Sequence, residues 1–156
     1  MIRIMFVCTG NICRSPTAHG VLEKMVTDAG LQDQVQVDSA GTHSYHMGEA
    51  PDGRSQIHAK RRGYDLSRQR ARQLRAKDFE DFDLILVMDS ANEVAARQIA
   101  PPEHLNRMHR LTDFCSHFPD TQVPDPYYGG DKGFEHVLDL VEDACTGVMN
   151  AVRDKQ

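Results

Sequence analysis

Cys8, Arg14 and Ser15 lie within one eight-residue segment, Cys-Thr-Gly-Asn-Ile-Cys-Arg-Ser, which joins an apolar run to a helical pattern. A cysteine at the end of a strand is a candidate nucleophile, and the arginine presents a planar fork that binds two oxygens of a phosphate group at once. The Ser15 hydroxyl can donate a hydrogen bond to the Cys8 sulfur and ease its departure as a leaving group. These residue types at this spacing predict covalent phosphoryl transfer through Cys8.

The setting of this segment favours anion binding. Residues 4–7 form an apolar run typical of a strand buried on both faces. Ser15 and Pro16 predict the start of a helix, with a capping hydroxyl followed by a proline at the first helical position. In a loop between strand and helix, backbone N–H groups can converge on an oxyanion, and the positive end of the helix favours the Cys8 thiolate.

The residues inside this loop are expected to set its shape. Gly10 permits the left-handed backbone values that a nest of N–H groups requires. Asn11 is placed to hold the loop through its side-chain amide, and it tolerates a positive φ better than most residues. The remaining members of the expected phosphate-binding loop are Thr9, Ile12 and Cys13.

The cysteines also have simpler interpretations. Cys8 and Cys13 taken alone are typical of buried small hydrophobes or of a pair of metal ligands. A zinc site is disfavoured because the C-x4-C spacing is loose and neither Cys115 nor Cys145 lies in a close ligand pair. We therefore expect no metal. Cys13 beside a reactive Cys8 suggests that it could trap an oxidised Cys8 as a reversible disulfide, although packing alone also explains it.

The segment from Val7 to Pro16 resembles the signature of the low-molecular-weight protein tyrosine phosphatases, and the resemblance spans the chain. It implies an enzyme without cofactors that hydrolyses phosphotyrosine in tyrosine-phosphorylated proteins through a phosphocysteine intermediate. It also implies a cytoplasmic location and inorganic phosphate as a product inhibitor. The other matching stretches are Asp38-Ser39-Ala40-Gly41-Thr42, Gly48-Glu49-Ala50-Pro51-Asp52, Ala71-Arg72-Gln73, Val87-Met88-Asp89 and Val123-Pro124-Asp125-Pro126-Tyr127-Tyr128.

Phosphate ester hydrolysis needs a positioned acid, because the alcohol leaves poorly as a bare oxyanion. Asp125 is the candidate, since Pro124 and Pro126 restrict the backbone on both sides and could hold its carboxyl over the loop. The resemblance implies that this position holds the general acid, which protonates the tyrosine oxygen and then takes a proton from the attacking water. Without the resemblance, Pro-Asp-Pro is more typical of a turn.

Aromatic side chains are expected to set the substrate class. Tyr127 and Tyr128 follow the candidate acid directly, and Tyr45 lies in another predicted loop. Aromatic walls beside a phosphate site form a slot deep enough for phosphotyrosine, whereas the shorter phosphoserine would not reach the sulfur. Because exposed tyrosines are common on loops, an ordinary surface residue is an equally good interpretation of each of these three tyrosines.

Three further positions match the family less directly. Ser39 is expected at the end of a second strand, where it supports the phosphate-binding loop through the asparagine of that loop. Gln69 stands where the family often has histidine, and it can hydrogen-bond but cannot carry charge, so we leave it outside the catalytic set. Asp89 matches a family position, but Asp89-Ser90 also predicts a helix start in which Ser90 and Glu93 form a capping box, and we prefer this cap.

Three alternative functions use the same phosphate site. Related arsenate reductases pass oxidation to a second cysteine pair, and here only Cys115 and Cys145 are available, in the wrong arrangement. Protein arginine phosphatases resemble this loop but carry threonine where Ile12 stands, and they lack the two adjacent tyrosines. The third is a non-catalytic phosphate-binding module that keeps only the loop, and the intact Cys8 and Asp125 argue against it.

Composition and charge agree with one catalytic domain over residues 1–156. A chain of 156 residues, 40% of them hydrophobic, is long enough for a core and short for two domains. We expect neither membrane insertion nor secretion, because no apolar run is long enough to span a bilayer and no signal-peptide pattern is present. A net charge of −5 argues against nucleic-acid binding. The basic residues crowded between Lys60 and Lys77 predict a solvated face, with a surface that steers anionic partners as the alternative.

Strand and helix patterns alternate along the chain. They predict an α/β fold, a sandwich with a four-stranded parallel sheet flanked by helices, in which the phosphate-binding loop follows the first strand. Such sheets carry their sites outside the carboxyl ends of the strands, where Cys8 and Ser39 are expected and over which a long loop 112–130 would bring Asp125. The expected strands are residues 4–7, 35–38, 84–87 and 108–111, and the expected helices cover about residues 15–29, 52–62, 90–100 and 134–152, the last with Cys145 on its buried face.

Overall fold

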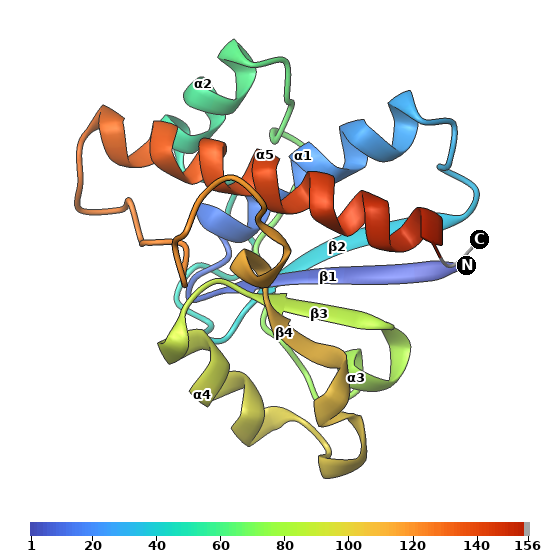
Figure 1. Cartoon of the computed structure of the whole chain (residues 1–156). Helices are drawn as coiled ribbons and strands as arrows, with labels where there is room; N and C mark the ends of the chain where they lie inside the picture. The colour runs from blue at the N-terminus through green and yellow to red at the C-terminus, as the bar shows by residue number, and fades with distance from the viewer. Residues whose placement is uncertain (155–156) are drawn as a thin grey trace.

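The computed structural model describes residues 1–154 and places four strands in one parallel sheet with the order β2-β1-β3-β4 (Figure 1). β1 pairs with β2 on one side and with β3 on the other, and β4 lies beside β3 at the far edge. The predicted α/β fold with a four-stranded parallel sheet is confirmed. The strands are β1 (Ile2–Cys8), β2 (Val35–Gly41), β3 (Leu84–Val87) and β4 (Met108–Arg110); the helices are α1 (Arg14–Asp28), α2 (Gly53–Arg61), α3 (Asp78–Asp81), α4 (Ser90–Ile99) and α5 (Asp131–Asp154), with 3₁₀ turns η1 (Pro102–Arg107) and η2 (Leu111–Phe114).

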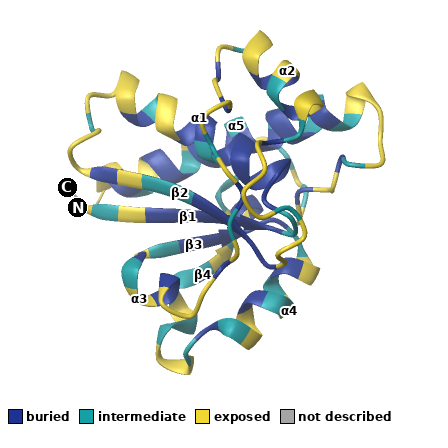
Figure 2. Cartoon of the chain, turned by 180° about the vertical axis from the view of Figure 1, so that it is seen from behind, coloured by how far each residue is buried: buried dark blue, intermediate teal, exposed yellow. Residues whose placement is uncertain are grey.

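Helices cover both faces of the sheet (Figure 1). α1 and α5 pack together on one face with α2 beside them, and α3 and α4 lie on the other. Because side chains alternate along a strand, β1 supplies both cores: Ile4 and Phe6 pack with α1 and α5, whereas Met5 and Val7 pack on the opposite side. All four side chains are completely buried, as the dark centre of the sheet shows in Figure 2. Burial on both faces explains the continuous apolar run in the sequence.

The start of α1 differs from the prediction. The helix begins at Arg14, Cys13 takes the N-cap position, and no side-chain cap hydrogen bond forms there. Ser15 therefore does not cap the helix, and its hydroxyl is used elsewhere. Pro16 still lies in the first turn, where backbone N–H groups have no intrahelical acceptor and a proline costs nothing. Ser39 is predicted at the end of the second strand, but it lies within β2, which continues to Gly41.

The long C-terminal helix confirms the apolar stripe that predicted it. The buried face of α5 packs against α1, α2 and η2. Cys145 on this face is completely buried, as expected. Within the described residues, no helix is both long and apolar enough to cross a membrane.

Two arginines of the basic stretch between Lys60 and Lys77 connect elements instead of forming a solvated face. Arg72 forms ion pairs with the carboxylates of Asp38 at 3.1 Å and Asp78 at 3.0 Å. Arg62, at the end of α2, forms ion pairs with three acidic side chains of α5, which are Glu135 at 2.8 Å, Asp139 at 3.0 Å and Glu142 at 2.5 Å. For these two residues the prediction of a solvated face is wrong.

Candidate active site

The cysteine loop, which we define as residues 8–14, connects Cys8 at the end of β1 to Arg14 at the start of α1. Cys8 Sγ lies 3.0 Å from Ser15 Oγ, within hydrogen-bonding distance. The left-handed residue of the loop is Asn11, with φ of 58°, and not Gly10 as we expected. Gly10 instead leaves room for the ring of His46, because a Cβ at position 10 would lie 2.9 Å from His46 Cδ2.

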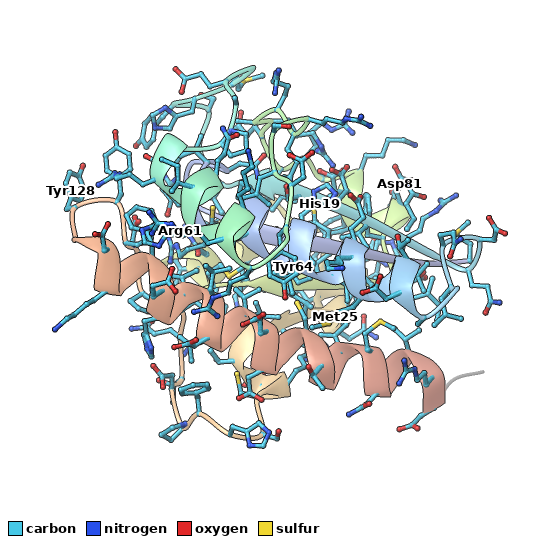
Figure 3. The ribbon with its side chains drawn as sticks, turned by 90° about the horizontal axis from the view of Figure 1, so that it is seen from above. His19, Met25, Arg61, Tyr64, Asp81 and Tyr128 are labelled. Carbon is cyan, nitrogen blue, oxygen red and sulfur yellow. The ribbon has the colours of Figure 1, made fainter. Side chains whose placement is uncertain are left out.

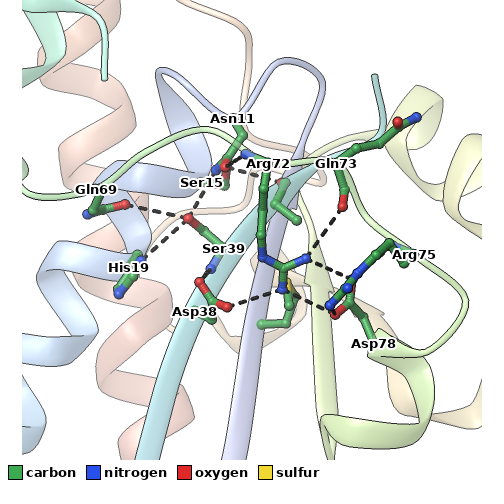
Figure 4. Close-up of polar contacts among 12 residues, drawn as sticks. Asn11, Ser15, His19, Asp38, Ser39, Gln69, Arg72, Gln73, Arg75 and Asp78 are labelled. Atoms are coloured by element: carbon green, nitrogen blue, oxygen red, sulfur yellow. Dashed lines mark hydrogen bonds and ion pairs between the residues drawn. The ribbon is translucent and has the colours of Figure 1, made fainter. Parts of the chain in front are cut away.

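Asn11 connects the cysteine loop to its surroundings (Figure 4). Its Nδ2 group donates to Ser15 Oγ at 2.8 Å and to Ser39 Oγ at 3.0 Å. Its Oδ1 atom accepts the backbone N–H of Arg72 at 3.0 Å. The side chain is almost fully buried, and these three hydrogen bonds hold a residue whose backbone is in a conformation that non-glycine residues rarely adopt.

Arg72 is in turn held by carboxylates on both sides (Figure 4). Its guanidinium donates to Asp38 on β2 and to both carboxylate oxygens of Asp78 at the start of α3. Asp78 is completely buried and also accepts the backbone N–H of Arg75 at 2.8 Å. The backbone that supports Asn11 is therefore fixed by an ion-pair network that local sequence signals did not identify.

The end of β2 forms the back of the cysteine loop. The backbone N–H groups of Thr42 and His43 donate to the carbonyls of Cys8 and Thr9, at 2.9 and 3.0 Å. Gly41 lies so close that a Cβ there would approach the carbonyl oxygen of Thr9 to 2.6 Å. The loop is thus supported by backbone contacts as well as by side chains.

Arg14 is buried, with 2% of its surface exposed, and one side of its guanidinium is already bonded. Nη1 donates to Asp89 Oδ2 at 2.6 Å and to the carbonyl of Val123 at 2.9 Å. Burial opposes the charged form, but the neighbouring Cys8 and Asp89 outweigh it and raise the pKa of Arg14. Nη2 makes one long hydrogen bond, to Thr9 Oγ1 at 3.4 Å. Nε has no hydrogen-bond partner among residues 1–154, so the edge formed by Nε and Nη2 keeps donor capacity for an anion.

Asp89 lies at a helix start, as the sequence predicts, and also pairs with Arg14, which the sequence did not indicate. Its Oδ1 atom accepts the backbone N–H of Asn92 at 2.8 Å and caps α4, while Oδ2 pairs with Arg14. The expected capping box of Ser90 and Glu93 is wrong, because Asp89 itself is the N-cap residue. Glu93 pairs instead with Arg97 and Arg110, which lie outside the cysteine loop.

Asp125 lies on the long loop before α5, which is fastened near the cysteine loop. The backbone N–H of Val123 donates to the carbonyl of Met88 at 2.7 Å, and the Val123 carbonyl accepts from Arg14. Asp125 Oδ1 accepts the backbone N–H of Tyr127 at 3.0 Å. Its other carboxylate oxygen lies 3.7 Å from Arg14 Nη2, so this oxygen faces the site.

These residues surround one cavity of about 250 Å³. The cavity brings together most of the residues that the sequence singled out, whereas Asn11, Ser15 and Ser39 do not line it. Burial is the main reason that the pKa of Cys13 is raised to about 12, so its thiol stays protonated at neutral pH. The lining residues are Cys8, Thr9, Gly10, Ile12, Cys13, Arg14, Tyr45, His46, Asp125, Tyr127 and Tyr128.

Aromatic side chains form the mouth of this cavity. Tyr127 packs edge-on against Tyr128 at 5.0 Å between ring centroids, and Tyr128 is 94% exposed at the outer end of the loop (Figure 3). Arg54 on α2 lies 5.4 Å from the Tyr127 ring and donates to its carbonyl at 2.8 Å, which holds this wall in place. Sequence reasoning missed Arg54 and His46, because only the fold brings them to the mouth.

The chain is similar to known proteins over nearly its whole length. The family model for low molecular weight phosphotyrosine protein phosphatase matches residues 3–156. A putative low molecular weight protein-tyrosine-phosphatase of Synechocystis sp. is 45% identical over 153 residues, which cover 97% of this chain and 96% of that protein. A crystal structure of a protein tyrosine phosphatase from Entamoeba histolytica superposes with a TM-score of 0.96 at 39% identity, covering 99% of both chains. The crystal structure of a Drosophila arginine phosphatase superposes with a TM-score of 0.89 at 30% identity, covering 97% of this chain and 98% of the other.

Proposed function

Because the chain belongs to the low molecular weight phosphotyrosine protein phosphatase family, we propose that it hydrolyses phosphotyrosine in proteins through a covalent phosphocysteine on Cys8. The observation that carries the proposal is that Cys8, Arg14 and Asp125 line the same cavity, although Asp125 is remote in the sequence. A nucleophile, an anion-binding group and an acid are the three groups that this reaction requires.

In the first step, the Cys8 thiolate attacks phosphorus and the bond between phosphorus and the tyrosine oxygen breaks. Protonated Asp125 gives its proton to that oxygen, so tyrosine leaves as a neutral phenol. The Nε and Nη2 edge of Arg14 binds phosphoryl oxygens, and the backbone N–H groups of the cysteine loop bind the others. Asp89 and the Val123 carbonyl orient Arg14 for this contact.

In the second step, water attacks the phosphorus of the phosphocysteine. The carboxylate of Asp125 accepts a proton from this water, the bond between phosphorus and sulfur breaks, and its electron pair returns to Cys8 Sγ. The Ser15 hydroxyl, 3.0 Å from the sulfur, donates a hydrogen bond that stabilises the departing thiolate. Inorganic phosphate remains in the loop until it dissociates, so it should inhibit as a product.

The aromatic mouth supports phosphotyrosine as the substrate class. Cys8 is almost fully buried, whereas Tyr45 and Tyr128, which line the same cavity together with Tyr127, are exposed. A phenyl ring fills the distance between the mouth and the sulfur while contacting aromatic walls, whereas a phosphoserine side chain is too short to do so.

Phosphoarginine is a second candidate substrate because the arginine phosphatase of Drosophila shares this fold. The loop position that we expect to discriminate between phosphoarginine and phosphotyrosine is Ile12 in this chain. Ile12 lines the cavity and is almost fully buried. Its apolar side chain has no hydrogen-bond acceptor for a guanidinium and packs well against an aromatic ring, so we favour phosphotyrosine. Arsenate reduction is disfavoured because Cys145 is completely buried and burial raises the pKa of Cys115 to about 12, so this pair is a poor thiol relay.

The proposed function is tested with phosphotyrosine, phosphoserine and phosphoarginine peptides and with wild type, Cys8→Ser and Asp125→Asn. We expect wild type to prefer phosphotyrosine, and Cys8→Ser to be inactive. Asp125→Asn should lower kcat about 100- to 10,000-fold while phosphate binding stays within a few fold. Acid quenching during turnover should leave a phosphoryl group on the peptide that contains Cys8.

Each result can contradict a different part of the proposal. Turnover by Cys8→Ser, or turnover without a phosphoryl adduct on the Cys8 peptide, would exclude the phosphocysteine route. A wild-type kcat in Asp125→Asn would remove Asp125 as the acid. Preference for phosphoarginine would leave the mechanism in place and overturn the substrate class.

A further inference from the structure

A histidine side chain lies behind the cysteine loop, although sequence reasoning gave it no role. His19 is on α1, labelled in Figure 3, and only 13% of its side chain is exposed. Its Nδ1 atom lies 3.4 Å from Ser39 Oγ, as Figure 4 shows. Its Nε2 atom lies 3.2 Å from Glu23 Oε2, one turn further along the helix.

Counting the protons of this cluster restricts the direction of its hydrogen bonds. Asn11 Nδ2 has two protons and gives one to Ser15 Oγ and one to Ser39 Oγ. Each serine oxygen is thus an acceptor from Asn11 and has one proton of its own to donate. Ser15 can give its proton to Cys8 Sγ at 3.0 Å, and the carbonyl of Ala40 is its other, longer choice at 3.4 Å. Ser39 must give its proton to a different acceptor.

Two acceptors face the Ser39 hydroxyl. One is Nδ1 of His19 at 3.4 Å, and the other is Oε1 of Gln69 at 3.5 Å. Gln69 is oriented for this contact because its Nε2 group donates to the carbonyl of Pro16 at 2.9 Å. His19 is oriented by Glu23, whose carboxylate accepts from Nε2; in the neutral imidazole Nδ1 is then an acceptor. The hydrogen bond with His19 is the main reason that the pKa of Glu23 is lowered.

We propose that His19 is a positioning residue for the phosphatase reaction, which acts through Ser39 and Asn11 on the Ser15 hydroxyl. By accepting the proton of Ser39, His19 leaves the Ser39 lone pairs for Asn11 Nδ2. Asn11 then keeps its second proton on Ser15, and Ser15 points its own proton at the Cys8 sulfur. His19 touches neither substrate nor sulfur, and this inference rests on the proposed phosphocysteine mechanism.

The chain of contacts predicts which chemical step His19 affects. Ser15 stabilises Cys8 as it leaves phosphorus, which happens in the second step. Loss of the His19 contact should therefore slow hydrolysis of the phosphocysteine and leave its formation almost unchanged. In kinetic terms, kcat should fall while kcat/KM, which reports the first step, stays close to that of wild type.

The test compares His19→Leu with His19→Asn, two side chains of similar size of which only asparagine can place an acceptor near Ser39. His19→Leu should lower kcat for p-nitrophenyl phosphate about 3- to 10-fold, change kcat/KM less than twofold and increase the phosphoenzyme present during turnover. His19→Asn should stay within twofold of wild type. Lys24→Gln, on the same helix and far more exposed, is the matched control and should behave as wild type.

A second measurement separates positioning from a general loss of stability. In a Ser39→Ala background, the further change His19→Leu should have no effect on kcat, because the partner through which His19 acts is absent. Urea unfolding of each variant checks that the fold is intact. His19→Ala, which adds no bulk, replaces His19→Leu if the leucine variant does not fold.

Three outcomes would overturn the role of His19. They are equal kcat values for His19→Leu and His19→Asn, an equal effect of His19→Leu with and without Ser39, and unchanged hydrolysis of the phosphocysteine in His19→Leu. Each of these outcomes is interpreted only when the wild-type enzyme forms the phosphocysteine. In that case the role of His19 is rejected and the proposed function still stands. Absence of the adduct in wild type would instead overturn the proposed function and this inference together.

Discussion

The buried Arg14 forms an ion pair with the half-buried Asp89, in which Arg14 Nη1 lies 2.6 Å from Asp89 Oδ2. The other oxygen of the same carboxylate accepts the backbone N–H of Asn92 at 2.8 Å and so caps α4. One side chain therefore connects the candidate anion-binding arginine on α1 to the start of a helix on the opposite face of the sheet. The orientation of Arg14 depends on this connection and on the loop that carries Asp125.

Asp89→Asn should separate these two roles. Asparagine caps helices as well as aspartate does, so α4 should keep its cap. The buried guanidinium loses its carboxylate, which should cost about 3 kcal/mol in the free energy of unfolding and lower kcat/KM about 10-fold or more. Asp89→Ala should cost about 1 kcal/mol more, because it also removes the cap. Urea unfolding and kinetics with p-nitrophenyl phosphate measure both effects, and wild-type kinetics in Asp89→Asn would contradict the role of this pair.

The strands and long helices were predictable because each has a signal within a short stretch of sequence. The continuous apolar run at residues 84–87 predicts β3 where it is found, and glycine at position 63 marks the end of α2 with φ of 92°. α3 was missed because four residues contain little more than one helical turn. The two 3₁₀ turns were missed because they lack the 3.6-residue repeat on which the prediction depends.

Residue types within one motif suffice to nominate candidate site residues, whereas contacts between distant residues leave no such signal in the sequence. Cys8 and Arg14 belong to one motif, and the structure brings them into one cavity with Asp125. Glycine is the residue that most readily adopts a left-handed backbone, so the sequence favoured Gly10, but the tertiary hydrogen bonds hold Asn11 in that conformation. His19 could not be found, because its contact with Ser39 joins α1 to β2 and leaves no local signal.

Gly41→Ala should disrupt the cysteine loop from behind. A Cβ at this position would lie 2.6 Å from the Thr9 carbonyl oxygen and 3.1 Å from the Asn11 nitrogen, and backbone atoms cannot move aside as a flexible side chain can. We expect a loss of about 1–3 kcal/mol in stability and a fall of at least about 10-fold in kcat/KM. Gly53→Ala is the matched control, because a Cβ there meets no atom within 4 Å. Loss of activity in both variants would show that the effect is not local to Gly41.

Iodoacetamide at pH 7 should label Cys8 before the other three cysteines. Cys8 lines the cavity, whereas burial raises the pKa of Cys13 and of Cys115 to about 12 and keeps both thiols protonated. Cys145 is completely buried. Peptide mass spectrometry against time should show one modified site, and inorganic phosphate should slow its modification. Equal labelling of Cys13, or no protection by phosphate, would contradict the assignment of the anion site.

Asp143 should make the stability of the fold depend on acidic pH. Its carboxylate on α5 accepts backbone N–H groups from Ser116, His117 and Phe118, at 3.1, 3.0 and 3.0 Å. Burial opposes ionisation, but these hydrogen bonds outweigh it and lower the pKa from its ordinary 3.8 to about 2. The group therefore stabilises the fold fully at pH values above about 4, and this contribution is lost as the pH falls from there through about 2.

Asp143→Asn tests this contribution, because asparagine keeps the shape but cannot accept three N–H groups with a charged carboxylate. The free energy of urea unfolding should be about 2 kcal/mol lower than that of wild type at pH 7, and the difference should shrink as the pH is lowered from 4 to 3. Asp33→Asn, in an exposed turn, is the control and should show no such trend. Because residues 116–118 lead into the loop that carries Asp125, kcat should fall with stability in Asp143→Asn. A difference that stays constant with pH would contradict the lowered pKa of Asp143.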